Sequence, residues 1–376
     1  MAGRLSVSIP LVIAFNDPMR EMAPIRAELD AALARVLDSG WLVLGDELAH
    51  FENEFAEFLE GGHVAGVANG SDALELALRA IDIGPDDTVI NVANAGGYAS
   101  TAILACRAHP IFVDVDPDTG LIDPEQLEGE TMASARAIII THLYGQMANM
   151  PALAEWAQTT NTRIVEDCAQ AHGARMAGRS AGAWGDIAAF SFYPTKNLGA
   201  LGDAGAVCSA NKALIERVRC LRQYGWGEKY VHEYAGGRNS RLDEIQAACL
   251  RARLPGLRAA NQRRRLIGRR YQNEINNPLI AVPNRRDDGS DVYHLYPVRC
   301  RQRQALMEHL RKESIQTAIH YPLPDHQQPA WKDRDHVPKL PHTEIRATEI
   351  LSLPLNSALT EPEIDHVIDA CNRFQA

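Results

Sequence analysis

The sequence predicts an α/β protein with a three-layer α/β/α large domain, built on a mostly parallel sheet, and a smaller C-terminal α+β domain. Short apolar runs of strand length alternate with segments whose apolar residues recur at helical spacing, as in parallel α/β folds. Some of these runs end in small polar turns, such as Asn69-Gly70-Ser71-Asp72. Ligands bind at the carboxyl ends of strands in such sheets, so these turns mark the edge where we expect the functional site.

The composition, with 46% hydrophobic and 23% charged residues, is typical of a soluble globular protein. A net charge of −10 argues against broad binding of nucleic acid, which needs a basic surface. No apolar run reaches the roughly 18 residues of a membrane span, and the N-terminus lacks a signal-peptide pattern. The seven cysteines include no C-x-x-C pair, which favours free thiols over disulfides or a zinc site. We therefore expect a cytoplasmic protein that binds no membrane, no nucleic acid and no metal.

The N-terminal two thirds of the chain carry most of the alternating pattern. Residues 9–15 form an apolar run that predicts a strand or arm, and a turn follows at Asn16-Asp17-Pro18. Apolar spacing predicts helices over 25–37 and 48–59, which end at glycines. Further along, the predicted strands are 64–68, 88–92, 111–115, 137–140, 163–165 and 186–192, and the predicted helices are 73–81, 99–108 and 150–158.

The C-terminal third has a different pattern. A long basic helical segment runs from Leu242 to about Ile275, and most of its arginines fit a solvated helix face. The change of pattern near residue 240 predicts a large domain over 1–240 and a small domain over 241–376. After that segment the sequence predicts a loop over 278–286, strands over 291–299 and 318–321, and helices over 302–313 and 361–374.

Lys196 is the first candidate for chemistry. It follows the stretch Phe190-Ser191-Phe192-Tyr193-Pro194-Thr195, and a glycine-rich run follows it. A lysine in a desolvated pocket can lose its proton and attack a carbonyl, forming a Schiff base, and the hydroxyl of Ser191 could donate to a phosphate. The alternative is an exposed turn lysine, which is the usual environment of a lysine. The pattern alone is weak, and it gains weight only from the segments described next.

A strand, a small polar turn and a helix meet at residues 64–81. This arrangement directs free backbone N–H groups and the positive end of the helix at an anion, so Gly70 and Ser71 are candidates for binding a phosphate. The alternative is that Ser71 or Asp72 simply caps the helix. The two interpretations are compatible, because the same unpaired N–H groups serve both.

Asp167 is the second candidate for chemistry. The predicted strand at 163–165 runs into Glu166-Asp167, 29 residues before Lys196. A carboxylate in this place can keep the ring nitrogen of a pyridoxal cofactor protonated, and Gln170 is close enough to bond the ring hydroxyl. Without a partner lysine, a loop carboxylate or a helix cap would be the simpler explanation.

Four motifs occur in one order along the chain and identify a resemblance. They resemble the DegT-like nucleotide-sugar aminotransferases, which are pyridoxal phosphate enzymes of the aspartate aminotransferase fold, fold type I. The resemblance runs from about residue 8 to the end and also includes Ser39-Gly40-Trp41 and Tyr321-Pro322-Leu323-Pro324. The motifs are Asn69-Gly70-Ser71-Asp72-Ala73-Leu74, Glu166-Asp167-Cys168-Ala169-Gln170-Ala171-His172-Gly173, Phe190-Ser191-Phe192-Tyr193-Pro194-Thr195-Lys196-Asn197 and Asn239-Ser240-Arg241-Leu242-Asp243-Glu244-Ile245-Gln246-Ala247.

The resemblance implies a role for each matching residue toward pyridoxal 5'-phosphate. Lys196 would hold the cofactor and move the proton, and Asp167 would pair with the pyridine nitrogen. Gln170 would bond the ring hydroxyl, and the phosphate would be bound by Gly70, Ser71 and Ser191. Asn239 would reach the phosphate of the neighbouring subunit's cofactor, which implies a homodimer with its active sites at the subunit interface.

One departure from the family concerns the residue that stacks on the cofactor ring. The family usually has an aromatic residue after a P-x-x-T-like turn, whereas this chain reads Val92-Ala93-Asn94-Ala95-Gly96-Gly97-Tyr98. Tyr98 is the aromatic residue of this segment, and we assign it the stacking role. Related dehydratases carry histidine in place of the lysine, so Lys196 argues against that branch.

The resemblance implies transamination in two halves, from L-glutamate to the keto group of a nucleotide-linked deoxysugar. The segment Ser39–Gly45 favours amination at carbon 3 of a dTDP-3-keto-6-deoxyhexose over amination at carbon 4, and an inosose ring is a further alternative. From another class, the chain could be a cofactor-binding regulator without turnover. Candidates for contacts with the substrate are Lys229, Arg238, Arg241 and Tyr321.

Overall fold

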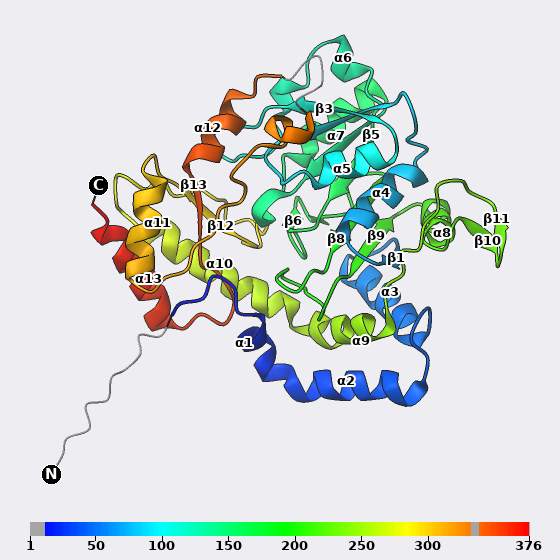
Figure 1. Ribbon diagram of the computed structural model, residues 1–376, viewed down its shortest axis with the longest axis horizontal. Helices are drawn as coiled ribbons and strands as arrows, with labels where there is room; N and C mark the ends of the chain where they lie inside the picture. The colour runs from blue at the N-terminus through cyan, green and yellow to red at the C-terminus, as the bar shows by residue number, and fades with distance from the viewer. Residues whose placement is uncertain (1–11, 332–337, 376) are drawn as a thin grey trace.

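The computed structural model describes residues 12–331 and 338–375. At its centre lies a seven-stranded sheet in the order β1-β9-β8-β5-β4-β2-β3 (Figure 1). The neighbouring strands pair in parallel except along both sides of β9, which runs opposite to the others. The strands are β1 (His63–Val67), β2 (Thr88–Val92), β3 (His109–Val113), β4 (Ala137–Thr141), β5 (Arg163–Asp167), β8 (Ile187–Ser191) and β9 (Gly205–Ser209).

Helices cover both faces of this sheet, which confirms the predicted α/β class. On one face lie α4 (Gly70–Ala80), α5 (Tyr98–Ala105) and α8 (Lys212–Leu221). On the other face lie α3 (Asp46–Phe58), α7 (Met150–Thr160) and α9 (Glu244–Arg253). Because side chains alternate along a strand, Val165 of β5 packs into the first layer and Ile164 into the second.

The N-terminal segment runs along the outside of the second layer. Ile13 forms a parallel bridge with Ile315, and residues 9–11 of the predicted arm lie outside the described residues. The segment then passes through α1 (Pro18–Met22) and a short 3₁₀ turn (Ala23–Ile25) into α2 (Arg26–Ser39). Figure 1 shows α2 lying beside α9, and the two helices share small buried side chains.

A second, smaller sheet lies near the C-terminus. Its strands, β12 (Tyr296–Arg299) and β13 (Ile350–Leu353), pair antiparallel, and α10 (Leu257–Glu274), α11 (Arg303–Lys312) and α13 (Glu361–Arg373) pack around them. Their shared core is separate from the two core clusters of the large sheet. Leu242, Ala247 and Leu250 belong instead to the core of the large sheet. The division at residue 240 stays a prediction.

Most predicted helices and strands appear within two or three residues of their expected bounds, but three predictions were wrong. The basic segment is two helices, because Pro255 interrupts it with a 3₁₀ turn at Leu254–Gly256. The strand expected over 291–299 is confined to β12, and residues 318–321 form only a single bridge between Ala318 and Ser352. The sequence analysis also missed α8, β9, β13, α12 (Pro341–Glu349) and the hairpin of β10 (Trp226–Glu228) and β11 (Val231–His232).

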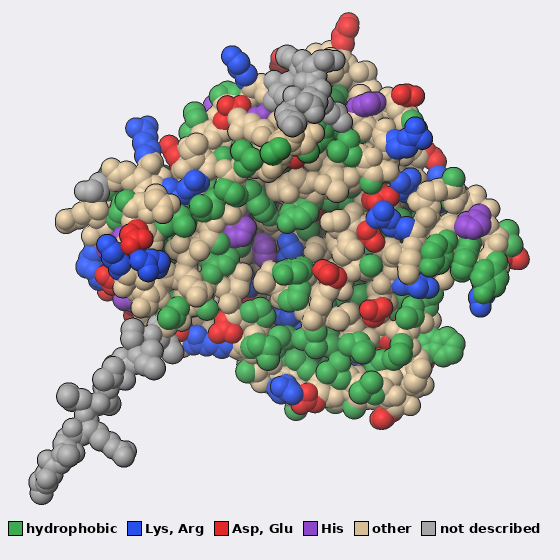
Figure 2. Space-filling model, in the orientation of Figure 1, with side chains coloured by type: hydrophobic (Ala, Val, Ile, Leu, Met, Phe, Trp, Pro, Cys, Tyr) green, Lys and Arg blue, Asp and Glu red, His purple; other side chains and the backbone are tan. Residues whose placement is uncertain are grey.

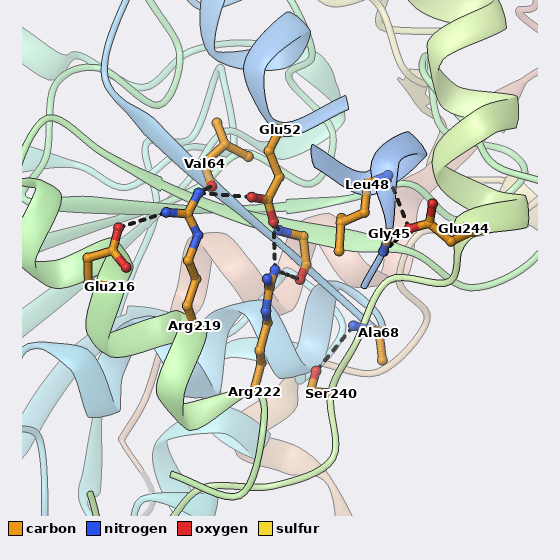
Figure 3. A network of polar contacts seen from close by, with 11 residues as sticks. Gly45, Leu48, Glu52, Val64, Ala68, Glu216, Arg219, Arg222, Ser240 and Glu244 are labelled. Atoms are coloured by element: carbon orange, nitrogen blue, oxygen red, sulfur yellow. Dashed lines mark hydrogen bonds and ion pairs between the residues drawn. The ribbon is translucent and has the colours of Figure 1, made fainter. Parts of the chain in front are cut away.

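Buried polar contacts fix β1 between the two layers (Figure 3). Glu52 of α3 accepts hydrogen bonds from the backbone N–H of Gly66, at 2.9 Å, and from Arg222, at 2.6 Å. Arg219 of α8 also reaches this carboxylate, at 2.9 Å. At the end of β1, the N–H of Ala68 donates to the Ser240 hydroxyl at 3.1 Å. These contacts set the position from which the turn at residues 69–72 leaves the sheet.

No helix among the described residues is both long enough and apolar enough to cross a lipid bilayer. All seven cysteines are free thiols, and all except Cys220 are buried.

Candidate active site

A cavity of about 530 Å³ opens at the carboxyl edge of the large sheet. Figure 2 shows histidine side chains set into a hollow near the middle of the face that it displays. Eight of the residues predicted for the site line this cavity: Gly70, Ser71, Tyr98, Asp167, Gln170, Ser191, Lys196 and Tyr321. A larger cavity, of about 890 Å³, lies between residues 116–125 and 281–286 and is lined by none of these eight.

Lys196 lies in the cavity on the turn that follows β8. Its backbone N–H donates to the carbonyl of Tyr193 at 2.8 Å, which closes the turn. Burial lowers the pKa of Lys196 to about 8, while the carboxylate of Asp167 acts in the opposite direction. About a tenth of this amine is therefore uncharged at pH 7, far more than for an ordinary lysine, and the uncharged form is the one that attacks a carbonyl carbon.

Asp167 ends β5 and faces the same cavity. Its carboxylate accepts from the N–H of Ala169 at 3.1 Å and from the hydroxyl of Thr141 at 3.3 Å. Burial nevertheless raises the pKa of Asp167 above its usual range, against the effects of these bonds and of Lys196. A cationic partner in the cavity would reverse that effect, because an opposite charge favours the ionised carboxylate.

Glu166 and His142 lie behind Asp167, together with Cys168, with possible metal-ligating atoms within 4.8 Å of one another. The carboxylate of Glu166 already has four donors, because it bonds His142 and the N–H groups of Gly182, Trp184 and Gly185. Burial also raises the pKa of the Cys168 thiol well above its usual value. This cluster is accounted for as structural support of β5.

The turn after β1 is built as an anion site at the start of α4. The Asn69 side chain caps the helix by accepting from the N–H of Asp72 at 2.8 Å. The N–H groups of Gly70 and Ser71 are left as the unpaired donors of the first turn, with Ser191 alongside. A Cβ at Gly70 would lie only 2.5 Å from the Cβ of Ser191. The residues therefore fit a phosphate group, because the gap between helix and serine exists only with glycine there.

Gln170 and Tyr321 form one wall of the cavity. The side-chain oxygen of Gln170 accepts from the N–H of Tyr144 at 2.6 Å, so its amide N–H₂ points toward the hydroxyl of Tyr321, 3.4 Å away. Tyr98 packs edge-on against Tyr321 with ring centroids 6.4 Å apart. The left-handed Gly97 lets the chain turn sharply into α5 just before Tyr98, which is half exposed at the cavity mouth. The stacking role of Tyr98 stays a prediction.

Four candidate residues do not line this cavity: Asn239, Lys229, Arg238 and Arg241. Asn239 is exposed and forms an isolated antiparallel bridge with Gln223, and Lys229 is exposed on the turn of the β10–β11 hairpin. Arg238 donates to Asp72 at 2.7 Å and to Glu75 at 2.8 Å, so its guanidinium is already engaged within the chain. Their roles toward substrate or a neighbouring cofactor stay predictions.

The cavity also contains residues that the sequence analysis did not single out: Asn16, Thr141, Tyr193, Thr195, His294 and His320. Tyr193 and Thr195 belong to the lysine motif and could have been proposed from it. Burial lowers the pKa of His320 to about 4 and that of His294 well below its usual range, with the charge of Lys196 as a further cause. Nothing in the local pattern around Asn16 or His294 indicates the site, because both arrive from distant parts of the chain.

Comparison with known proteins agrees with this geometry. Residues 24–372 match the DegT/DnrJ/EryC1/StrS aminotransferase family. The chain is 45% identical over 364 residues to the dTDP-3-amino-3,4,6-trideoxy-alpha-D-glucose transaminase of Streptomyces venezuelae, covering 96% of each chain. It is 42% identical over 363 residues to the dTDP-3-amino-3,6-dideoxy-alpha-D-galactopyranose transaminase of Aneurinibacillus thermoaerophilus, covering 96% of this chain and 99% of that one.

The crystal structure of S. venezuelae DesV in complex with a ketimine intermediate superposes with a TM-score of 0.92. That pair shares 44% sequence identity, over 96% of this chain and 98% of DesV. The predicted resemblance is confirmed over nearly the whole sequence. This chain belongs to the DegT/DnrJ/EryC1/StrS aminotransferase family.

Proposed function

We propose that this protein is a pyridoxal phosphate-dependent aminotransferase that moves an amino group from L-glutamate to carbon 3 of a dTDP-linked keto-deoxysugar. One observation carries the proposal: a lysine of lowered pKa and a buried carboxylate line the same cavity as an anion-binding helix start. This combination is what a pyridoxal cofactor needs at its aldehyde, its ring nitrogen and its phosphate.

The residues that would hold the cofactor come from the ends of several strands. Lys196 would bind it covalently, Asp167 would face its ring nitrogen, and Gln170 its ring hydroxyl. Gly70, Ser71 and Ser191 would receive its phosphate, and Tyr98 would cover its ring. When bound, pyridoxal phosphate supplies an aldehyde that takes up the amino group and a ring that withdraws electrons from the substrate carbon.

Lys196 is suited to move the proton as well as to hold the cofactor. General acid–base catalysis is most efficient when the pKa of the group lies near the working pH, and burial brings the pKa of Lys196 to about 8. Asp167, ionised by a cationic partner, would keep the ring nitrogen protonated throughout. Tyr321 and Gln170 close the wall beside them.

Both substrates would use this one cavity in turn, because one lysine and one carboxylate serve both halves of the reaction. Initial-rate plots against the two substrates should therefore be parallel lines. Intersecting lines would mean that both substrates are bound together and would contradict the shared cavity.

Carbon 3 is favoured because the two relatives described above are named for 3-amino sugars. Amination at carbon 4, or of an inosose ring, is the alternative outcome of the same assay. Lys229, Arg238 and Arg241 are the candidate contacts for the diphosphate of the substrate, and Tyr321 for its sugar.

We include a homodimer in the proposal. Figure 2 shows apolar side chains gathered on the surface around α2 and α9, and the exposed residues include Leu37, Trp41 and Leu42. Exposed apolar groups of this size are typical of interfaces. Asn239 and Lys229 lie outside their own cavity, which suits contacts with a neighbouring subunit's cofactor and substrate.

A cytoplasmic location is also proposed, because seven free thiols suit a reducing compartment.

Incubation of the purified, cofactor-loaded protein with L-glutamate tests the proposal. An aminotransferase releases 2-oxoglutarate and the absorption of its bound cofactor changes, whereas a regulator without turnover shows neither effect. Borohydride reduction followed by peptide mapping should place the cofactor on Lys196. Attachment to another lysine would contradict the site.

A further inference from the structure

His294 occupies a place in the cavity wall that the proposed reaction does not yet use. His294 is only 6% exposed to solvent, and it lines the same cavity as Lys196. One ring nitrogen, Nδ1, lies 3.1 Å from the side-chain oxygen of Asn197, the residue that follows Lys196. The other, Nε2, has no hydrogen-bond partner among the described residues. Both ring nitrogens of His172 also lack a partner but are fully buried, whereas Nε2 of His294 is not fully buried.

The amide of Asn197 determines which nitrogen of His294 carries the proton. The side-chain N–H₂ of Asn197 donates to the carbonyl of Val292 at 3.0 Å and to the side-chain oxygen of Asn261 at 2.9 Å. The carbonyl of Val292 can only accept, so the amide cannot be turned around. The oxygen of Asn197 therefore faces His294, and Nδ1 must be the donor.

Asn261 is held in turn, because its own N–H₂ donates to the carbonyl of His172 at 2.7 Å. The chain of amides is thus oriented from both ends, and it leaves Nε2 of a neutral His294 with an unshared electron pair open to the cavity. Burial and the positive charge of Lys196 both disfavour the protonated ring.

An uncharged acceptor at this place suits one of the two proposed substrates. L-Glutamate brings carboxylates, which only accept, and its single donor group, the amine, is the group that the aldehyde of the cofactor would take up. A sugar brings hydroxyl groups, which donate. Resting on the proposed function, we propose that Nε2 of His294 accepts a hydrogen bond from a ring hydroxyl beside the reacting carbon of the sugar, and that Asn197 holds the ring in the tautomer this requires.

The tautomer is testable without any activity. In the cofactor-free protein labelled with ¹⁵N-histidine, the ring signals of His294 are identified by their loss in His294→Leu. We expect Nδ1 to be the protonated nitrogen and Nε2 the unprotonated one. A proton on Nε2, or a doubly protonated ring at neutral pH, would overturn the assignment.

The hydroxyl contact is tested by binding of two amino sugars that differ at one carbon. dTDP-3-amino-3,6-dideoxy-galactose keeps hydroxyls at carbons 2 and 4, and dTDP-3-amino-3,4,6-trideoxy-glucose keeps only the one at carbon 2. Loss of one hydrogen bond at a buried acceptor should weaken binding roughly tenfold in His294→Leu. Weaker binding of both sugars assigns carbon 2, and weaker binding of the first alone assigns carbon 4. Unchanged binding of both overturns the proposal.

Two further variants complete the experiment. His294→Gln places an amide oxygen near the position of Nε2 and should restore most of the affinity, which a purely structural role would not predict. His366→Leu, on α13 far from the cavity, is the matched control and should bind both sugars as the wild type does.

The glutamate half-reaction should stay within about twofold of wild type in His294→Leu, because binding of that substrate is not affected. Failure of this half-reaction in the wild type would instead refute the proposed function.

Discussion

Lys196 and Asp167 have mutually dependent charges. Burial pushes both groups toward their neutral forms, while each charge favours the other. Such opposed effects are typical of functional sites, because a purely structural ion pair gains nothing from being nearly neutral. Binding of the cofactor should therefore depend on the charge of Lys196, and it should also depend on the absence of a side chain at Gly70.

The capture of pyridoxal phosphate by the cofactor-free protein should accelerate with rising pH around a midpoint near 8. Only the uncharged amine attacks, and the lowered pKa of Lys196, about 8, means that deprotonation is complete well below the ordinary lysine value of 10.5. Stopped-flow absorbance across a pH series measures this rate. A midpoint near that of a free lysine would show that burial does not lower the pKa.

Gly70→Ala should weaken cofactor binding by roughly tenfold or more while leaving the fold intact. The new Cβ would lie 2.5 Å from the Cβ of Ser191, so the serine must move out of the proposed phosphate site. Titration of the cofactor-free protein with pyridoxal phosphate measures the change. Gly84→Ala is the matched control, because its Cβ meets nothing within 4 Å. Equal affinities of the two variants for the cofactor would contradict a phosphate site between Gly70 and Ser191.

At the scale of elements, the site depends on how firmly β1 is held between α3 and α8. Glu52 and Arg222 are both buried, and each also bonds the backbone of Gly66 (Figure 3). A buried pair of this kind is weak evidence for stability by itself, but removal of one partner leaves the other charge uncompensated.

Glu52→Ala should lower the free energy of unfolding by about 3–5 kcal/mol, since Arg222 would stay buried without its carboxylate. Chemical denaturation followed by circular dichroism measures this loss. Arg373→Ala breaks a surface pair with Glu313 and should change stability by at most about 1 kcal/mol. Similar values for both variants would mean that the buried pair is solvated after all.

The β10–β11 hairpin is a second element with a separable role. It exposes aromatic side chains, with the Trp226 ring 4.9 Å from that of Tyr224 and 5.1 Å from that of Tyr230. Lys229, at its tip, has its Nζ 5.2 Å from the centre of the Tyr230 ring. The hairpin therefore presents a cation on a stiff aromatic support away from its own cavity.

Lys229→Ala should raise the KM for the nucleotide-linked sugar roughly tenfold and leave the glutamate half-reaction unchanged, because a charge contact with a diphosphate is lost. Steady-state kinetics with each substrate varied separately measure this difference. Lys212→Ala, at the exposed start of α8, is the control for loss of one positive charge. An equal effect on both substrates would refute a contact specific to the diphosphate.

At the scale of the whole molecule, the cavity of one chain contains few cations for an anionic substrate. Lys196 is the only lysine or arginine among the described residues that line it. The proposed homodimer would supply the missing charge through Lys229 and a neutral polar contact through Asn239, with each chain serving the other.

Mixed dimers test that arrangement. Lys196→Ala and Asn239→Ala should each have little activity alone, but co-expression should restore roughly one quarter of the wild-type sites, because half of random dimers contain one intact site. Activity per site of the unfractionated mixture measures this recovery, and heterodimers isolated with two tags should reach roughly one half of the wild-type value. An absence of recovery would show that Asn239 acts within its own chain.

The sequence alone determined the order of most helices and strands of the large sheet, and it singled out Lys196, Asp167 and the turn at residues 69–72, which the fold brings to one cavity. These features are local, because periodicity and turn chemistry act over a few residues. Long-range packing decided the rest. It buries Arg264 against Glu21, although the sequence suggested a solvated helix face. It also places His294 against Asn197, 97 residues away, where only the folded chain orients the ring.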